Sequence, residues 1–459
     1  MTIQDTMAGA LARFVNRASF DHLSADALQQ LKIRVLDSVG CAIGALGSDM
    51  GAAIREHVEY FGGNEIATMI GGGRTAPDLA ALHNSALVRY LDFNDSYLAP
   101  GETCHPSDNV GAVLAAAERA GADGRGFLTA LAVAYQVQCR LSDEAPVRAG
   151  GFDHTTQGSY AVACGVAKAL GLDLERTANA IAISGTAFNA LRVTRTGTLS
   201  NWKGLAYPNT AFCGTHATFL AARGITGPPE VFEGVKGFMD SIAGGFEIDW
   251  SSEDLERVNR TIIKRFNAEI HSQSAIEAAL ELKDAHGFDA DGIESIEIDT
   301  FDVAFHIIGG GEEGDKTIVH TKEQADHSLN YMVAAALLDG DVMPEEYRPE
   351  RIESEDVQAL LRKVRVREDA GLSGRFPDEM PVRVTITLED GARHEREKTD
   401  YHGFHTRPMD WAAVSRKFER LVGGKVDARM RGEIMQVVEG LEDAVIADLI
   451  DPLSRISTR

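Results

Sequence analysis

The period of the hydrophobic pattern changes twice along this chain, and these changes limit the folds that the chain can adopt. Up to about residue 262, apolar residues recur every three to four positions, which is the period of amphipathic helices. Beyond that point Ile296, Ile298 and Thr300 alternate with polar residues, which is the period of a β-strand. Helical periodicity returns near Asp410. This order predicts a helical domain that is interrupted by a domain containing a sheet.

The first segment predicts a dense helical domain. Ser24 can cap a helix that carries Leu31, Val35 and Val39 on one face. Many later segments are rich in small residues, which let helices approach one another closely. Further helices are expected at 77–91, 106–121, 126–142, 155–171, 174–187, 206–224 and 229–244.

The middle segment predicts an α+β domain. Strands are expected at 296–300, 363–367 and 382–389, with a hairpin turn at Asp390 and Gly391, and helices at 272–285 and 326–338. The predicted fold is therefore mainly α with an α+β part. Both chain ends, residues 1–262 and 402–459, form a large all-helical domain, and residues 263–401 form an inserted, smaller α/β domain.

Bulk composition excludes several classes of partner. The 459 residues carry a formal charge of −24, which argues against nucleic acid and anionic membranes as partners but allows an anionic substrate in a locally basic pocket. No apolar run is long enough for a membrane-spanning helix, and the first residues do not resemble a signal peptide. Five widely spaced cysteines suit a reducing compartment. A cytoplasmic location without an iron–sulfur or zinc site is expected.

Candidate catalytic side chains gather in the segment RYLDFNDSYLAPGETCHPSDN. Asp92 and Ser96 are four residues apart and share one face if the helix over 77–91 continues. His105 directly precedes Pro106, a residue suited to the first position of a helix, so His105 is expected as the N-cap. The helix dipole there favours neutral imidazole, a competent general base. Alternatively, both residues are structural: Asp92 caps a helix or forms a salt bridge, and His105 is the last residue of a loop.

Two further segments place a basic side chain before a helix. His154 precedes a small-residue helix whose first N–H groups can bind a substrate carboxylate. Lys203 precedes a helix that is expected to start near Pro208, and its ammonium group can pair with a carboxylate. Alternatively, His154 caps the helix or lies at the surface, and Lys203 is solvated.

The α+β segment adds two candidate groups. Lys264, Arg265 and His271 cluster before an amphipathic helix at the proposed domain junction, where a cation-rich cleft could bind a polyacid. His327 can precede or cap a helix that places Tyr331 on the same face, and the Tyr331 hydroxyl group can orient a substrate or donate a proton. Alternatively, Lys264, Arg265 and His271 belong to a charged connecting segment, and Tyr331 lies at the edge of the core.

Taken together, these segments resemble the MmgE/PrpD family. LDFNDSYLAPGETCHPSDN is similar to the family's Asp-Phe-Asp-Asp-Thr run followed by His-Pro-Ser. Further similar segments occur in the family's order: LKIRVLDSVGCAIGAL near the N-terminus, then WKGLAYPNTA, ARGITGPPEVFEGVKGF, KRFNAEIHSQSAIEAALEL and DHSLNYMVAAALLDG. The resemblance covers most of the chain, and the ordered set is far more specific than any single motif.

The resemblance implies a fold, a site and a class of reaction. It implies a helical domain built from both chain ends, a smaller α/β lid domain, a homodimer, and a site in the cleft between the domains. Relatives dehydrate 2-methylcitrate, decarboxylate cis-aconitate or epimerise iminodisuccinate, without a metal or an organic cofactor. The positions that match the family's site residues are Asp92, Ser96, His105, His154, Lys203, Lys264, His271 and Tyr331.

Four departures from the family pattern bear on the substrate and the reaction. Asn94 stands where an acid is usual, Ser96 replaces Thr, and Asn267 replaces Pro. The stretch over 400–408 also differs from that of the dehydratases. These differences bear on the exact substrate and reaction more than on the family.

The functional hypothesis is a metal-free, dehydratase-like lyase acting on a di- or tricarboxylate. Lys203 and Lys264 would bind substrate carboxylates and so ease removal of the adjacent proton. His105 or His154 would take the proton, the other histidine or Tyr331 would protonate the departing hydroxyl group, and Asp92 would orient an imidazole.

Three alternatives remain open at this point. An epimerase of a substituted succinate such as iminodisuccinate uses the same proton abstraction and returns the proton to the opposite face. A cis-aconitate decarboxylase-like enzyme needs a similar pocket. A non-catalytic helical binding protein is disfavoured, because Asp, His and Lys residues concentrate at helix starts.

Overall fold

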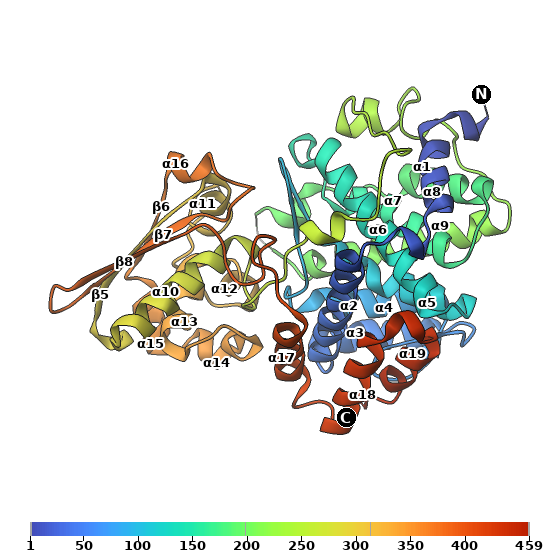
Figure 1. The fold of residues 1–459 in the computed structure, drawn as a ribbon. Helices are drawn as coiled ribbons and strands as arrows, with labels where there is room; N and C mark the ends of the chain where they lie inside the picture. Colours follow the sequence, from blue (N-terminus) through green and yellow to red (C-terminus); the bar gives the residue numbers. More distant parts are fainter. Residues whose placement is uncertain (1, 198, 313, 458–459) are drawn as a thin grey trace. The chain divides into compact units, whose positions relative to one another are not determined.

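The computed structural model describes residues 2–197, 199–312 and 314–457 and divides into two compact units (Figure 1). Unit 1 comprises Met1–Arg195, Asn201–Thr261 and Asp410–Arg459, and unit 2 comprises Thr196–Ser200 and Ile262–Met409. Within the described ranges, no helix combines the length and the apolar character that crossing a membrane requires. The mainly α fold class with a smaller α+β part is confirmed.

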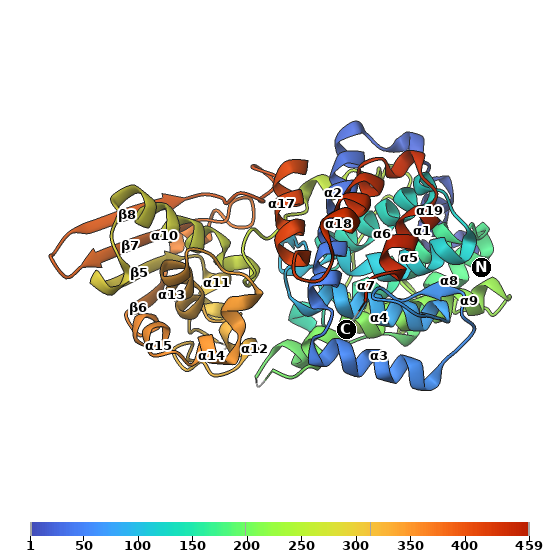
Figure 2. The same ribbon diagram turned by 90° about the horizontal axis from the view of Figure 1, so that it is seen from below.

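Unit 1 is a stack of helices completed by the C-terminal segment. Its α-helices are α1 (Met7–Arg17), α2 (Ala25–Ala45), α3 (Asp49–Phe61), α4 (Pro77–Tyr90), α5 (Val110–Ala120), α6 (Gly124–Glu144), α7 (Thr155–Ala169), α8 (Leu174–Ala187), α9 (Trp202–Ala222), α17 (Trp411–Val422), α18 (Ala428–Glu439) and α19 (Ile446–Ser454). Both views show α17 and α18 beside α2, and α19 beside α5 (Figures 1 and 2). The chain ends therefore share one core.

Local signals explain where several of these helices begin and which become buried. The Ser24 hydroxyl oxygen accepts a hydrogen bond from the Ala27 N–H and caps α2, as predicted. Almost every residue of α7 is buried, which suits a helix with small or apolar residues all round. Helix α7 packs against α6, α8 and α9, so the segments that carry candidate site residues surround a rigid centre.

Two helix predictions in unit 1 were wrong in detail. The helix expected over 229–244 is a series of turns followed by a short π-helix, Met239–Ala243, because Gly234 and Gly237 and the two prolines before them disfavour a regular helix. Helix α9 begins at Trp202, not near Pro208, and Pro208 lies inside it. Lys203 is consequently part of the first turn of α9.

Unit 2 contains a four-stranded sheet in the order β6-β5-β7-β8. The strands are β5 (Ile293–Thr300), β6 (Val364–Glu368), β7 (Val382–Leu388) and β8 (Arg393–Lys398). Strand β5 pairs in parallel with β6 and antiparallel with β7, and Ile296 lies opposite Val364 on one side and Ile386 on the other. The alternating pattern of the sequence thus predicted β5, β6 and β7 correctly, and β8 follows the predicted hairpin turn at Asp390 and Gly391.

Helices α10 (Gln273–His286) and α13 (Leu329–Asp339) pack on the sheet and on each other and bury the core of unit 2 (Figure 2). Helix α15 (Glu355–Leu361) packs against α13. The remaining helices are short: α11 (Asp302–Ile308), α12 (Lys322–Ala325), α14 (Pro349–Ile352) and α16 (Ala370–Ser373). Since α13 begins at Leu329 and Ser328 caps it, His327 precedes this helix.

Candidate active site

Asp92 lies just after α4 and anchors the first part of the candidate site in unit 1. Its φ of +53° is in the left-handed region, so helix α4 ends before it. The prediction that Asp92 and Ser96 share one face of a continued helix was therefore wrong. One Asp92 oxygen lies 2.6 Å from Nη1 of Arg89, and the other lies 3.5 Å from Nζ of Lys203. The carboxylate therefore joins α4 to the first turn of α9.

Asn94 connects this loop to the start of α5. Its Nδ2 donates to Ser107 Oγ and to Asp108 Oδ1, both at 2.8 Å, while its Oδ1 accepts from Arg89 at 3.2 Å. Burial raises the pKa of the Asp108 carboxyl group to about 7, against the opposing effect of the Arg89 guanidinium. An amide at position 94, where the family usually has an acid, thus avoids placing a second carboxylate against Asp108.

His105 is held by the backbone of the same loop. Its Nδ1 lies 2.8 Å from the carbonyl oxygen of Asp95 and 3.1 Å from Ser96 Oγ. Because a carbonyl oxygen can only accept, Nδ1 carries the proton, and in the neutral form of the ring the lone pair is on Nε2. The sequence hypothesis gave this orienting task to Asp92, and the Asp95 carbonyl oxygen is a partner of Nδ1 that the hypothesis did not include.

The Asp95 side chain fixes that carbonyl in turn. Its Oδ1 accepts from the Ser107 N–H at 3.0 Å, and its Oδ2 accepts from the Tyr135 hydroxyl group at 2.8 Å. His105 precedes the 3-10 helix Pro106–Asn109, which runs into α5, so the predicted helix start after His105 is confirmed. The His105 side chain makes no capping hydrogen bond there.

His154 lies beside His105 at the start of α7. The ring centroids are 5.5 Å apart, and the rings meet edge to face. The Arg195 guanidinium donates to Nε2 of His154 at 3.1 Å, so this nitrogen is unprotonated and the ring is neutral. Burial lowers the pKa of His154 to about 3, and Arg195 adds to this effect against the opposing Asp153 carboxylate.

Arg195 joins the Asp153–His154 pair to Lys203. Its Nε donates to Asp153 Oδ2 at 2.9 Å, and its Nη1 donates to the Lys203 carbonyl oxygen at 3.1 Å. Burial alone would raise the pKa of Asp153, but Arg195 and Arg192 hold it well below its usual range. Sequence reasoning missed Arg195. The only available signal was its position between the Asp153–His154 pair and Lys203.

The candidate substrate-binding residues of unit 2 surround Glu269. His271 Nδ1 lies 2.8 Å from Glu269 Oε1, and the His271 N–H donates to Oε2 at 2.8 Å. Burial would raise the pKa of Glu269, but the charges of His271, His327 and Lys264 leave it at about 2. Lys264 and His271, which the sequence proposed as one group, therefore lie near the same carboxylate.

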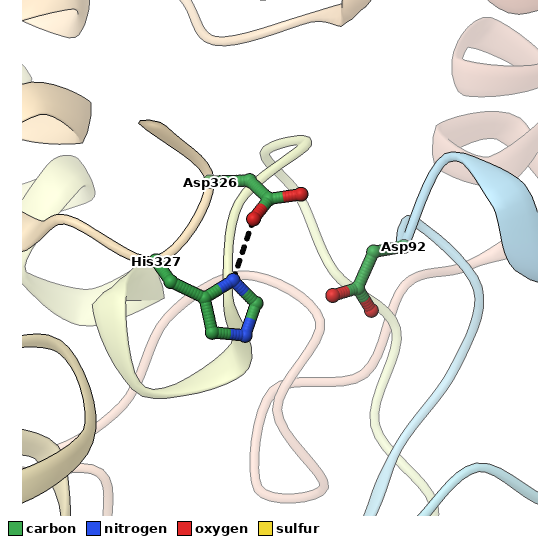
Figure 3. A group of neighbouring side chains, drawn as sticks. All are labelled: Asp92, Asp326 and His327. Atoms are coloured by element: carbon green, nitrogen blue, oxygen red, sulfur yellow. Dashed lines mark hydrogen bonds and ion pairs between the residues drawn. The ribbon is translucent and has the colours of Figure 1, made fainter. Parts of the chain in front are cut away.

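A second histidine–carboxylate pair in unit 2 lies just before α13. Asp326 Oδ1 lies 2.5 Å from His327 Nδ1 (Figure 3), and Asp326 Oδ2 accepts from Lys322 Nζ at 2.6 Å. His327 lines a cavity of about 530 Å³ together with Lys316, Gln324 and other residues of unit 2. Asp326 had not been singled out from the sequence, although it directly precedes His327.

Tyr331 is part of the core of unit 2. Its side chain is fully buried among α10, α13 and the sheet, and its hydroxyl group donates to the Glu346 carbonyl oxygen. Burial raises the pKa of this hydroxyl group above its usual range. The prediction that Tyr331 and His327 share a helical face was wrong, because α13 begins after His327, and these contacts do not support a catalytic role.

The structure brings five of the eight candidates together within unit 1. Asp92 contacts Lys203, Ser96 contacts His105, and His105 contacts His154. All five are buried: Asp92, Ser96, His105, His154 and Lys203. Within unit 2, Lys264 and His271 form a group around Glu269, and Tyr331 belongs to the core of that unit.

These features suit acid–base chemistry on an anion. An imidazole with a fixed tautomer, a lysine and several carboxylates lie within a rigid helical unit, and the same chain carries an inserted α+β unit. The chain belongs to the MmgE/PrpD family: the MmgE/PrpD N-terminal domain matches residues 9–251, and the MmgE/PrpD C-terminal domain matches residues 266–443. The family predicted from the sequence is therefore confirmed.

Relatives of known activity are similar over most of the chain. The 2-methylcitrate dehydratase of Escherichia coli (strain K12) is 32% identical over 357 residues, which cover 72% of each chain. The mitochondrial 2-methylcitrate dehydratase of Yarrowia lipolytica is 28% identical over 92% of this chain and 84% of its own. The cis-aconitate decarboxylase of Mus musculus is 26% identical over 95% of this chain and 90% of its own.

These relatives bear on the class of enzyme. All three are lyases, so the prediction of an enzyme of the lyase class is confirmed. The epimerase alternative gains no support from them.

Proposed function

We propose that this chain is a lyase that dehydrates a small polycarboxylate of the 2-methylcitrate type by removing a proton next to a carboxylate. The observation that carries the proposal is the hydrogen bond from His105 Nδ1 to the Asp95 carbonyl at 2.8 Å. In the neutral form of the ring, this hydrogen bond leaves the basic lone pair on Nε2, and the neighbouring His154 has a pKa of about 3. A general base needs this protonation state at neutral pH.

In the proposed mechanism, the Lys203 ammonium group pairs with a substrate carboxylate. Negative charge that develops on this carboxylate as the adjacent C–H bond breaks is then stabilised electrostatically. His105 Nε2 takes the proton, the C–O bond to the hydroxyl group breaks, and the new C=C bond forms. The imidazolium ion formed on His105 carries the proton with which the hydroxyl group can leave as water.

His154 supports His105 as a neutral neighbour in this proposal. A charged ring at its position would repel the imidazolium ion that forms on His105, so a pKa of about 3 for His154 favours the reaction. Arg195 keeps it in this state through the hydrogen bond to Nε2. Ser96 is proposed to steady the His105 ring, and Asp92 to hold Lys203 in place.

Lys264 and His271 are proposed as further substrate-binding residues from unit 2. Both are buried polar groups next to Glu269, and a tricarboxylate has more negative charge than one lysine can balance. Their contribution is expected in KM, because they do not touch the proton that is transferred.

A decarboxylase of the cis-aconitate type is the second candidate, since the mouse relative with that activity is similar over 95% of this chain. Both reactions pass through negative charge beside a carboxylate. The stretch 400–408 differs from the corresponding segment of the dehydratases. The products distinguish the candidates, because only the decarboxylase releases carbon dioxide.

The test is an activity panel with 2-methylcitrate, citrate, cis-aconitate and iminodisuccinate. A rise in ultraviolet absorbance on 2-methylcitrate or citrate, with a product one water lighter, supports the dehydratase. Carbon dioxide from cis-aconitate identifies the decarboxylase. Exchange of the α-hydrogen in heavy water without a rise in ultraviolet absorbance would support the epimerase alternative. The absence of turnover on all four compounds would contradict the proposed function.

We also propose that the chain works as a cytoplasmic homodimer that needs no metal or organic cofactor. The family resemblance is the support for these points. Light scattering measures the mass of the assembly, and activity after dialysis against a chelator tests the independence of metal.

A further inference from the structure

Helix α17 returns to unit 1 after unit 2 and packs closely against α2. The close approach depends on two glycines one turn apart on α2. A Cβ atom on Gly40 would lie 3.1 Å from Phe418 Cδ2, and one on Gly44 would lie 3.5 Å from Leu421 Cδ2. A side chain on Gly40 would crowd Phe418, and a Cβ atom on Gly44 would already be in van der Waals contact with Leu421, so the two glycines allow α17 to lie close to α2.

One turn before Gly40, this contact buries an ion pair. Lys417 Nζ on α17 lies 2.6 Å from Asp37 Oδ1 on α2. Lys417 is 7% exposed and Asp37 is 1% exposed, so both groups have lost nearly all of their water. Replacing such a pair by apolar residues is often neutral or stabilising, and stability alone therefore does not account for it.

The Lys417 ammonium group has a second partner in the loop that carries the site. It donates to the carbonyl oxygen of Phe93 at 2.7 Å and lies 3.8 Å from the centroid of the Phe93 ring. Phe93 directly follows Asp92, which contacts Lys203, and precedes Asp95 by two residues. The carbonyl of Asp95 accepts the hydrogen bond from His105.

We propose that Lys417, paired with Asp37, is a positioning residue that fixes the Phe93 peptide and thereby the Asp92 carboxylate and the Asp95 carbonyl. The inference rests on the proposed function of His105 as the base. Asp92 has a left-handed backbone, which is unfavourable for a non-glycine residue, so the loop needs an external contact to keep this conformation. Lys417 supplies it from a helix 324 residues further along the chain.

The test compares a double variant with a matched control. Asp37→Leu combined with Lys417→Met removes the ion pair without leaving a buried unpaired charge. Lys425→Met is the control, because Lys425 Nζ also donates to a backbone carbonyl of unit 1, that of Leu46, away from the site loop. Thermal unfolding establishes that both variants are folded at the assay temperature.

In the double variant, kcat is expected to fall by about 10- to 100-fold, because a small displacement of a catalytic base is costly, while KM changes much less. Amide hydrogen exchange in the segment 92–105 is expected to be about fivefold faster, as for the loss of one hydrogen bond. The Lys425→Met control is expected to retain the wild-type kcat and the wild-type exchange in this segment.

Three results would contradict the positioning role: a folded double variant with wild-type kcat, unchanged exchange in 92–105, or an equal loss of kcat in the control. Failure of the proposed function looks different, because wild-type protein would then turn over none of the polycarboxylates. The exchange measurement alone would decide the positioning role in that case.

Discussion

His105 and Asp95 are ten residues apart, and the imidazole Nδ1 of the first donates to the backbone carbonyl of the second at 2.8 Å. A backbone carbonyl cannot take up a proton at neutral pH, so it fixes the tautomer without competing for the proton that the base removes. The geometry of the loop therefore helps to set the tautomer of the proposed base.

The first prediction concerns that base. His105→Ala should lower kcat by at least about 100-fold, since a positioned general base contributes on the order of 10²–10⁴ in rate. Steady-state kinetics on the best substrate of the panel measures the loss. His216→Ala, at an exposed histidine paired with Asp78, serves as the control. A kcat of the His105→Ala enzyme within threefold of the wild-type value would contradict the assignment of His105 as the general base.

The pH dependence of stability tests the state of His154. Its folded pKa of about 3 lies below the unfolded value of about 6.5, so the unfolded chain binds more protons between these values. The contribution of this group to the free energy of unfolding is therefore complete above about pH 6.5 and is lost as the pH falls toward 3.

His154→Gln should remove this contribution and flatten the pH dependence between about pH 4 and 6 by up to about 1.4 kcal/mol per pH unit. Urea unfolding at several pH values measures the slope. His57→Gln, at an exposed position on α3, should leave the slope as in wild type. An unchanged slope in the His154 variant would show that folding does not lower the pKa of this ring.

Arg195 is predicted to hold the site together. Arg195→Met leaves the Asp153 carboxylate buried without its closest cation and should lower the free energy of unfolding by about 3 kcal/mol, with a loss of kcat. The neighbouring Arg192 lies 3.8 Å from the same carboxylate, so Arg192→Met should have a smaller effect on both quantities. Equal effects of the two substitutions would refute the specific role of Arg195.

The two site lysines are expected to act in substrate binding. Lys203→Met and Lys264→Met should each raise KM by about 10- to 100-fold, which corresponds to the loss of one charged hydrogen bond. Lys168→Met is the control, because Lys168 donates to backbone carbonyls near α1. If both site variants keep the wild-type KM, neither lysine binds the substrate.

Tyr331 offers a test that separates a core residue from a catalytic one. Tyr331→Phe keeps the ring and removes only the hydroxyl group that donates to Glu346. Stability should fall by about 1 kcal/mol, while kcat should stay within threefold of wild type. A 100-fold lower kcat would restore the catalytic role that the sequence suggested for this residue.

The sequence predicted most of the fold because local patterns specify it. Ser24 caps α2 within one turn of the chain, and the alternation around Ile296 follows from the pleat of a strand with one buried face. Prediction was wrong at 229–244, where glycines and prolines outweigh a weak apolar pattern.

The site was only partly predictable from the sequence. His105 and His154 could be found because each directly precedes a helix. In the structure their ring centroids lie 5.5 Å apart. The left-handed backbone of Asp92 and the contact of Lys417 with Phe93 depend on packing between distant segments. No local pattern records such contacts, so these features could not be inferred without the structure.

The separation of Lys417 from Phe93 also affects how the protein is made. The ribosome adds roughly 5–20 residues per second, so about 15 to 65 s pass between the synthesis of Phe93 and that of its lysine partner 324 residues later. During this interval α2 has no α17 to cover Gly40 and Gly44. The folding of the nascent helical domain therefore cannot finish until the whole inserted unit has been synthesised.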